Sequence, residues 1–178
     1  MTAFELSILD WIQTLRCGFL DAVMPVVTKL GDGGIIWIGL TLVLLCTRRY
    51  RRTGLTLVCA LLLDVVCCNL VLKPLVARVR PFDMNPGVDL LISPPGDWSF
   101  PSGHTAASFA STGALYASGE RMWIGAAVLS VLIAFSRLYL YVHYPTDVLA
   151  GIVIGTVLGV ASRRLFLFAE EKWRRRAA

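Results

Sequence analysis

The chain has 178 residues, of which 56% are hydrophobic and 16% are charged. Ordinary globular domains are roughly 45–50% apolar, so this composition argues against a water-soluble enzyme. The net charge is +5, but the basic residues form clusters beside long apolar runs. Such clusters are typical of the flanks of membrane helices rather than of a nucleic-acid surface. Composition therefore predicts a single membrane-embedded domain over residues 1–178, with the phospholipid bilayer around it and no nucleic-acid partner.

Residues 1–30 predict a partly amphipathic helix. Its apolar side chains recur at helical spacing and so share one face, and the charged residues stand at other positions. The apolar set is Phe4, Ile8, Trp11, Ile12 and Leu15. We expect a break near Cys17–Gly18, after which the helix continues from Phe19 to Leu30.

Five further apolar segments predict helices, because a bilayer core of about 30 Å is crossed by roughly 20 helical residues. One of them is rich in Ala, Ser and Gly, which predicts a helix buried among others. The last has Gly151, Gly155 and Gly159 at a spacing that lets another helix approach closely. The fold class is thus an all-α integral membrane bundle of about six transmembrane helices. The five segments are Gly34–Cys46, Gly54–Leu72, Thr105–Ser118, Arg121–Val142 and Thr146–Phe168.

The basic residues predict the orientation of this bundle in the plasma membrane. With both termini in the cytoplasm, six crossings leave eleven of the seventeen Lys and Arg residues inside, including a basic tail over residues 169–178. This is the distribution that the positive-inside rule expects. The long loop over residues 74–100 then lies outside the cytoplasm.

Nearly all of the polar residues suited to chemistry lie in three short stretches, which this orientation brings to the extracytoplasmic face. Together they supply three fixed cations, two imidazoles and a carboxylate. Such a set can hold a phosphate group and cleave its ester. The stretches are KPLVARVRP (residues 73–81), PSGH (101–104) and SRLYLYVHYPTD (136–147).

His143 and Asp147 are four residues apart, and Pro145 between them is a natural first-turn residue of the last helix. The Asp147 carboxylate can then accept a hydrogen bond from one ring nitrogen of His143 and leave the other nitrogen free to attack phosphorus. The alternative for this pair alone is a histidine that caps a helix near the membrane interface.

The PSGH stretch opens the Ala- and Ser-rich helix. Backbone N–H groups at such a helix start bind anions, and Gly103 lets a phosphate oxygen approach the backbone. Ser102 offers both an N–H and a hydroxyl group. His104 is placed to protonate a leaving group as a general acid. The alternative for the motif alone is a plain N-cap turn.

Lys73, Arg80 and Arg137 are the three cations, and each stands near the end of an apolar run. A cation at membrane depth is costly and usually has a partner. An arginine fork can contact two phosphate oxygens, whereas lysine acts as a point charge. For any one of them alone, the alternative is a side chain that reaches back to the interface.

The spacing K-x6-RP, PSGH and SR-x5-H-x3-D resembles the type 2 phosphatidic acid phosphatase family, which shares its site with vanadium-dependent haloperoxidases. The resemblance covers about Leu55 to Gly159. It implies that His143 is the nucleophile, that Asp147 orients it and that His104 is the general acid. It also implies that phosphate is bound by Lys73, Arg80, Ser102, Gly103 and Arg137.

The resemblance implies no metal and no cofactor. The sequence agrees with this, since the aspartates of the long loop form no tight cluster and the five cysteines form no CxxC pair.

Two charged residues fall outside the motifs. Asp64 lies about nine residues before Lys73 on one helix, roughly 14 Å deeper, and we expect its carboxyl group to bond to a neighbouring helix. Arg78 contacts either a second phosphate or only the headgroup region.

The prediction is a hydrolase that removes phosphate from a membrane lipid through a phosphohistidine, with undecaprenyl diphosphate as the first choice of substrate. Phosphatidic acid, phosphatidylglycerol phosphate and diacylglycerol diphosphate are the alternatives. Two other classes stay open, namely a non-catalytic phospholipid-binding protein and a haloperoxidase-like enzyme that uses vanadate. The sequence leaves the oligomeric state open.

Overall fold

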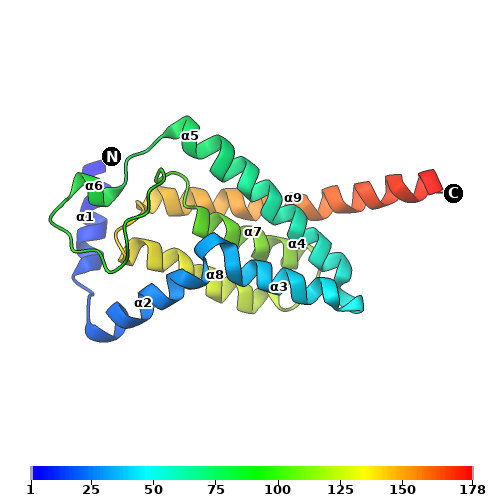
Figure 1. Cartoon of the computed structure of the whole chain (residues 1–178), viewed down its shortest axis with the longest axis horizontal. Coiled ribbons are helices and arrows are strands. Elements are labelled where there is room, and N and C mark those ends of the chain that lie inside the picture. The colour runs from blue at the N-terminus through cyan, green and yellow to red at the C-terminus, as the bar shows by residue number, and fades with distance from the viewer. Residues whose placement is uncertain (1, 178) are drawn as a thin grey trace.

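The computed structural model describes residues 2–177, so residues 1 and 178 of the predicted domain and tail lie outside the described part. Every regular element in this part is helical, which confirms the all-α prediction. Figure 1 shows most of the helices running along one long axis. The longer helices are α1 (Thr2–Gln13), α2 (Gly18–Leu30), α3 (Ile35–Cys46), α4 (Arg51–Asp64), α7 (Gly103–Ala117), α8 (Trp123–Tyr139) and α9 (Pro145–Ala177).

Short helical segments complete the chain order. The 3-10 turns η1 (Asp32–Gly34) and η2 (Arg48–Tyr50) flank α3, and the π-helical segment η3 (Val65–Leu72) joins α4 to α5 (Lys73–Val76). The single-turn helix α6 (Pro81–Met84) stands in the long loop before α7.

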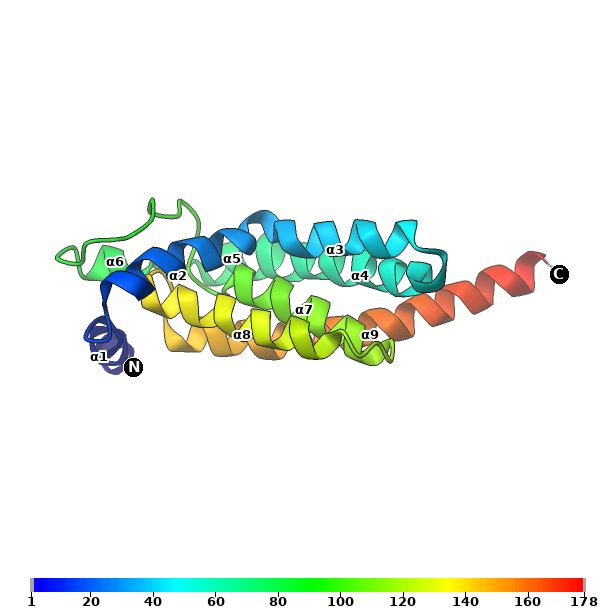
Figure 2. The same cartoon turned by 90° about the horizontal axis from the view of Figure 1, so that it is seen from below.

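The first helix does not cross the bundle. It lies across the end where α5 and α6 are found, and in Figure 2 it is seen almost end-on beside the lengthwise helices. The chain breaks after Gln13 and resumes helically at Gly18, as the sequence predicts. Hydrogen bonds fix α1 in place, from Gln13 Nε2 to the Tyr139 carbonyl (2.9 Å) and from the Tyr141 hydroxyl to Asp10 (2.7 Å).

Helices α2 and α3 form one bent segment rather than two antiparallel crossings. They meet at an angle of 46°, and Gly33 and Gly34 adopt positive φ values of 57° and 72° at the bend. A bend of this size does not reverse the chain. As a result, α1 lies at one end of the long axis and the last turns of α9 project from the other (Figure 1). The sequence predicts both termini at one end of the bundle, whereas the structure has them at opposite ends. The count of about six helices holds approximately.

Two helical segments are long and apolar enough to cross a membrane, Arg48–Met84 and Pro145–Arg176, and the bent pair is a third. Helix α8 is a shorter apolar helix. Most of α7 is buried among these neighbours, as its small residues predict. Its closest partner is α9, because a Cβ atom at Gly155 would lie 2.3 Å from the Ala106 carbonyl oxygen. The prediction of close approach at the α9 glycines is thus confirmed.

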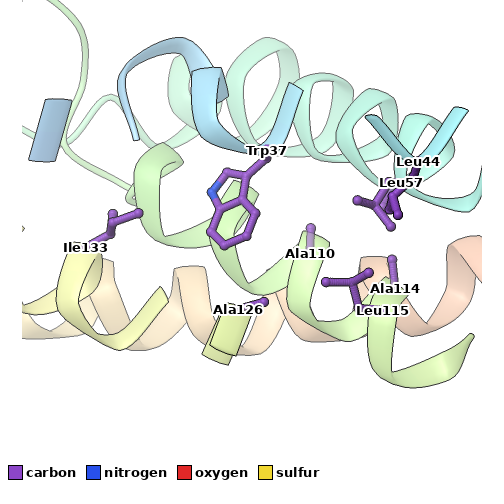
Figure 3. Packing of buried hydrophobic residues seen from close by; sticks show 9 residues of the cluster. Trp37, Leu44, Leu57, Ala110, Ala114, Leu115, Ala126 and Ile133 are labelled. Carbon is purple, nitrogen blue, oxygen red and sulfur yellow. The ribbon is translucent and has the colours of Figure 1, made fainter. Parts of the chain in front are cut away.

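The main apolar core lies between α3, α4, α7 and α8. Figure 3 shows Trp37 directed from α3 toward α7, with small alanines facing it. The Trp37 indole nitrogen donates to the Ser108 hydroxyl at 3.0 Å, which satisfies its one polar atom inside the bundle. This core fixes the position of α7, whose first turn belongs to the site described next.

Candidate active site

The predicted site residues come together at one end of the bundle, where α5, α7 and α9 meet the loop between α8 and α9. A cavity of about 340 Å³ lies among them. Of the predicted site residues, only Ser102 and Asp147 do not line it. The predicted residues among its lining are Lys73, Arg80, Gly103, His104, Arg137 and His143.

The three cations are buried beside the cavity. Lys73 begins α5, Arg80 precedes α6, and Arg137 lies in the last turn of α8. Their exposed fractions are 9%, 3% and 2%. Arg137 Nη1 donates to the Thr28 hydroxyl at 2.5 Å, while its buried Nε has no hydrogen-bond partner among residues 2–177. Buried cations with an unused donor are suited to an anion.

Asp97 is the carboxylate that faces these cations, and the sequence analysis missed it. It pairs with Lys73 Nζ and accepts from Arg80 Nη2 at 2.6 Å, while Arg80 Nε donates to the Asp97 carbonyl at 2.8 Å. Burial by itself raises the pKa of Asp97, but the bond and charge of Lys73 and the charge of Arg80 outweigh it and lower the pKa to about 2. Asp97 is therefore ionised and forms ion pairs with two of the three cations. Its one sequence signal is its place four residues before the PSGH stretch.

His143 lies in the loop between α8 and α9, and its two ring nitrogens face different partners. Nε2 is 3.3 Å from Arg80 Nη1, and Nδ1 is 3.5 Å from Asp147 Oδ2. Because arginine can only donate, this geometry makes Nε2 the acceptor and leaves the ring proton on Nδ1. The expected pairing with Asp147 is thus present as a close approach, but it is longer than a hydrogen bond.

The ring of His143 is neutral near pH 7. Its exposed fraction is 1%, and burial lowers its pKa to about 3. The neighbouring carboxylate of Asp147 opposes this shift, while the charges of Arg137 and Arg80 add to it. A neutral imidazole has the free nitrogen lone pair that a nucleophile needs.

Asp147 is completely buried in the first turn of α9 and is held by several donors. Its Oδ2 accepts from the Ser99 hydroxyl at 2.5 Å and from the Tyr144 backbone N–H at 2.9 Å. Ser99 is a second residue that the sequence analysis missed. Its position two residues before PSGH gives no sign of contact with a residue 48 positions away.

His104 faces the cavity from the first turn of α7. Its Nε2 lies 2.7 Å from Asp32 Oδ1, at the bend between α2 and α3. A Cβ atom at Gly31 would lie 2.8 Å from the His104 ring, so the bend packs closely against the imidazole. Asp32 is a third contact that the sequence did not indicate.

Ser102 and Gly103 have different surroundings at the start of α7. The Ser102 N–H donates to the Asp147 carbonyl at 3.1 Å, and its buried hydroxyl bonds to Thr105 at 2.9 Å. Both groups that were expected to face phosphate are thus already bonded within the protein. At Gly103 a Cβ atom would lie 3.2 Å from Asn69 Oδ1 and 3.6 Å from Lys73 Nζ, so a side chain there would press on Asn69 beside that cation.

A second cavity of about 330 Å³ continues from the first. It shares Lys73, Asp97, Gly103 and His104 with the first cavity. It then passes apolar residues of α3, α4 and η3, namely Ile38, Leu61 and Val65.

Asp64 lines this second cavity. It is 2% exposed, and its Oδ1 has no hydrogen-bond partner in the described part of the chain. The expected bond from Asp64 to a neighbouring helix is therefore not found there.

Arg78 does not line either of these cavities. Its guanidinium group bonds to Asp147 and Glu5 at 2.5 and 2.6 Å. The sequence analysis expected Arg78 to contact a second phosphate or the headgroup region. In the structure its partners are instead these two carboxylates. Within residues 2–177 no group of three or more His, Cys, Asp or Glu side chains is arranged to hold a metal ion.

Comparison with known proteins identifies the family. A family model described as the PAP2 superfamily matches residues 53–171. The chain belongs to the PAP2 superfamily. This confirms the family that the three motifs indicate, and with it the prediction of a membrane-embedded phosphatase.

Relatives of this PAP2 chain include the undecaprenyl-diphosphatase of Sulfolobus acidocaldarius, with 35% identity over 89% of this chain and 77% of that protein. The lipid A 4'-phosphatase of Bacteroides thetaiotaomicron is 31% identical over 87% of this chain and 73% of that protein. The crystal structure of a transmembrane PAP2 type phosphatidylglycerolphosphate phosphatase from Bacillus subtilis matches with a TM-score of 0.74 and 27% identity, covering 96% of this chain and 86% of that one. The structure of Aquifex aeolicus LpxE matches with a TM-score of 0.76 and 28% identity, covering 89% and 94%.

Proposed function

We propose that the chain hydrolyses a lipid diphosphate or phosphomonoester at the membrane surface, with undecaprenyl diphosphate as its substrate and undecaprenyl phosphate and phosphate as products. The observation that carries the proposal is the cavity that joins Lys73, Arg80 and Arg137 to both histidines of the chain. The names of several relatives, which include undecaprenyl-diphosphatases, support this lipid. Phosphatidic acid, phosphatidylglycerol phosphate and diacylglycerol diphosphate remain the alternatives.

The reaction has two displacements at phosphorus. His143 Nε2 forms a bond to the terminal phosphorus as the bond from that phosphorus to its leaving oxygen breaks. The leaving oxygen is the bridging oxygen of a diphosphate or the ester oxygen of a phosphomonoester, and His104 gives it a proton. Water then attacks the phosphohistidine, His104 takes a proton from it, and phosphate leaves. Lys73, Arg80 and Arg137 neutralise the charge on the phosphate oxygens in both steps, with the Gly103 backbone at the start of α7 beside them.

The substrate has to move two side chains of the unliganded site, Arg80 and Asp97. Arg80 Nη1 lies against His143 Nε2, so it must turn to a phosphate oxygen before the nitrogen can attack. Asp97 must leave Lys73 and Arg80 as phosphate arrives. The second cavity, with apolar walls on α3 and η3, gives the lipid chain a route from the site toward the bilayer.

The site end is proposed to face away from the cytoplasm. The cluster Arg48–Arg52 and the basic end of α9 lie at the opposite end of the long axis (Figure 1), where the positive-inside rule places cytoplasmic charge. Residues 1–178 then form one domain with the loop over 74–100 outside and the tail over 169–178 inside, while α1 lies at the outer surface.

The test is phosphate release by purified protein in detergent with excess chelator, across undecaprenyl diphosphate and the three alternative lipids. We expect release from undecaprenyl diphosphate to be fastest, and His143→Ala to abolish turnover while the variant still binds the lipid. Asp147→Asn should leave a small residual rate, since it alters orientation rather than the nucleophile. Wild-type activity in His143→Ala would refute the mechanism, and release from another lipid alone would replace the substrate.

A further inference from the structure

The Asp147 carboxylate is held on two sides. Ser99 and the Tyr144 N–H bind Oδ2, the oxygen nearest to His143. Arg78 Nη1 binds the other oxygen, Oδ1, at 2.5 Å. The guanidinium therefore approaches Asp147 from the side away from the nucleophile.

The other end of Arg78 reaches the N-terminal helix. Arg78 Nη2 donates to Glu5 Oε2 of α1 at 2.6 Å, and the guanidinium lies 3.9 Å from the centre of the Tyr144 ring. Glu5 is 4% exposed although it carries a charge. A rigid fork that contacts one carboxylate with each nitrogen holds both in fixed positions.

Thr146 closes this arrangement next to Asp147. Its hydroxyl donates to Glu5 Oε1 at 2.5 Å and accepts from Arg78 Nη1 at 2.7 Å, and its backbone N–H donates to Glu5 Oε1 at 3.1 Å. Glu5 thus bonds to the first turn of α9 directly and through Arg78. The contacts join residues 5, 78 and 147, which lie far apart in the sequence, and Glu5 stands before the residues that the family model matches.

We propose that Arg78 and Glu5 are positioning residues, which hold the Asp147 carboxylate against His143 and make turnover depend on the docking of α1. The inference rests on the proposed function, because it takes Asp147 as the group that orients the nucleophile. Neither residue touches the phosphate cavity. Their loss should therefore lower kcat while KM changes little, since a misplacement of about 1 Å can cost on the order of a hundredfold in rate.

The experiment measures kcat and KM of Arg78→Lys and Glu5→Gln with undecaprenyl diphosphate in detergent. Arg78→Lys keeps the charge but loses the fork, and Glu5→Gln keeps the shape but loses the charge. We expect kcat to fall by about tenfold to a hundredfold and KM to stay within about threefold in both. The matched control is Arg16→Lys, because Arg16 also joins two segments at this end, through Asp21 and the Asp89 carbonyl, and does not contact Asp147.

A combined variant separates positioning from general stability. In Asp147→Asn the carboxylate is already lost, so adding Arg78→Lys should reduce kcat by less than about threefold further, because both changes act on one unit. The proposal would be overturned if the loss of kcat in the double variant equalled the product of the losses in the two single variants. Wild-type kcat in both Arg78→Lys and Glu5→Gln would overturn it as well. A thermal unfolding curve for each variant checks that the variant is folded. If Arg78→Lys does not fold, Glu5→Gln provides the test.

His143→Ala is assayed beside these variants. If it is inactive while Arg78→Lys and Glu5→Gln match the wild type, the positioning role alone fails. If it retains wild-type turnover, the proposed function fails and the positioning role with it.

Discussion

Asp97 places a negative charge where the substrate phosphate is proposed to bind. Its carboxylate pairs with Lys73 and Arg80, and with a pKa of about 2 it is ionised near neutral pH. A phosphate group must displace it from both cations. Half of the Asp97 side chain is exposed, so the carboxylate can turn toward solvent while the backbone around it stays in place.

Asp97→Asn should therefore strengthen the binding of phosphate. Each partly exposed ion pair contributes roughly 0.2–1 kcal/mol, and Asp97 makes two such pairs. The inhibition constant of inorganic phosphate should therefore fall by about twofold to thirtyfold. The inhibition constant is measured from the inhibition of lipid hydrolysis by inorganic phosphate. Asp89→Asn, in the same loop, is the control. A weaker inhibition by phosphate would mean that Asp97 arranges the two cations rather than competing for them.

The contact between α7 and α9 is the element-scale feature on which the site depends. The first turn of α7 carries Gly103 and His104, and the first turn of α9 carries Asp147. Between them the helices touch backbone to backbone, because Gly155 and Gly159 leave no room for a side chain against Ala106 and Ala110. Small residues at a helix interface favour such close packing in membranes.

Gly155→Ala should force the two helices apart. Overpacking of this kind costs about 1–3 kcal/mol, so the thermal midpoint should fall, and kcat should fall with it because the site is split between the two helices. Gly125→Ala on α8 is the matched control, since a Cβ atom there meets nothing within 4 Å and alanine favours a helix. Equal midpoints for the two variants would contradict the packing argument.

At the scale of the whole molecule, the bend between α2 and α3 decides at which end of the bundle each end of the chain lies. Five segments run along the long axis, namely α2–α3, α4–η3, α7, α8 and α9. Because five is an odd number, α1 and the end of α9 lie at opposite ends (Figures 1 and 2). This layout keeps the basic ends of the helices together while α1 stays beside the site.

Single cysteines test this layout in a variant without the five native cysteines. A membrane-impermeant maleimide should label Ser7→Cys on α1 in intact cells, whereas Lys172→Cys on α9 should react only after permeabilisation. Both positions are exposed in the folded chain, so access to the reagent is set by the membrane. Labelling of both positions from one side would contradict the five lengthwise crossings.

The sequence by itself determined the helical class, the family and the residues that gather around the cavity, because helix length, glycine spacing and three local motifs are properties of short segments. Only the tertiary structure decided which partners those residues have. These partners come from segments that are distant along the chain. They are Asp97 for the cations Lys73 and Arg80, Ser99 and Arg78 for Asp147, and Asp32 for His104. The same holds for the end of the bundle at which α1 lies. Hydropathy records that a segment is apolar, but it does not record whether the glycines that follow the segment bend the chain by 46° or reverse it.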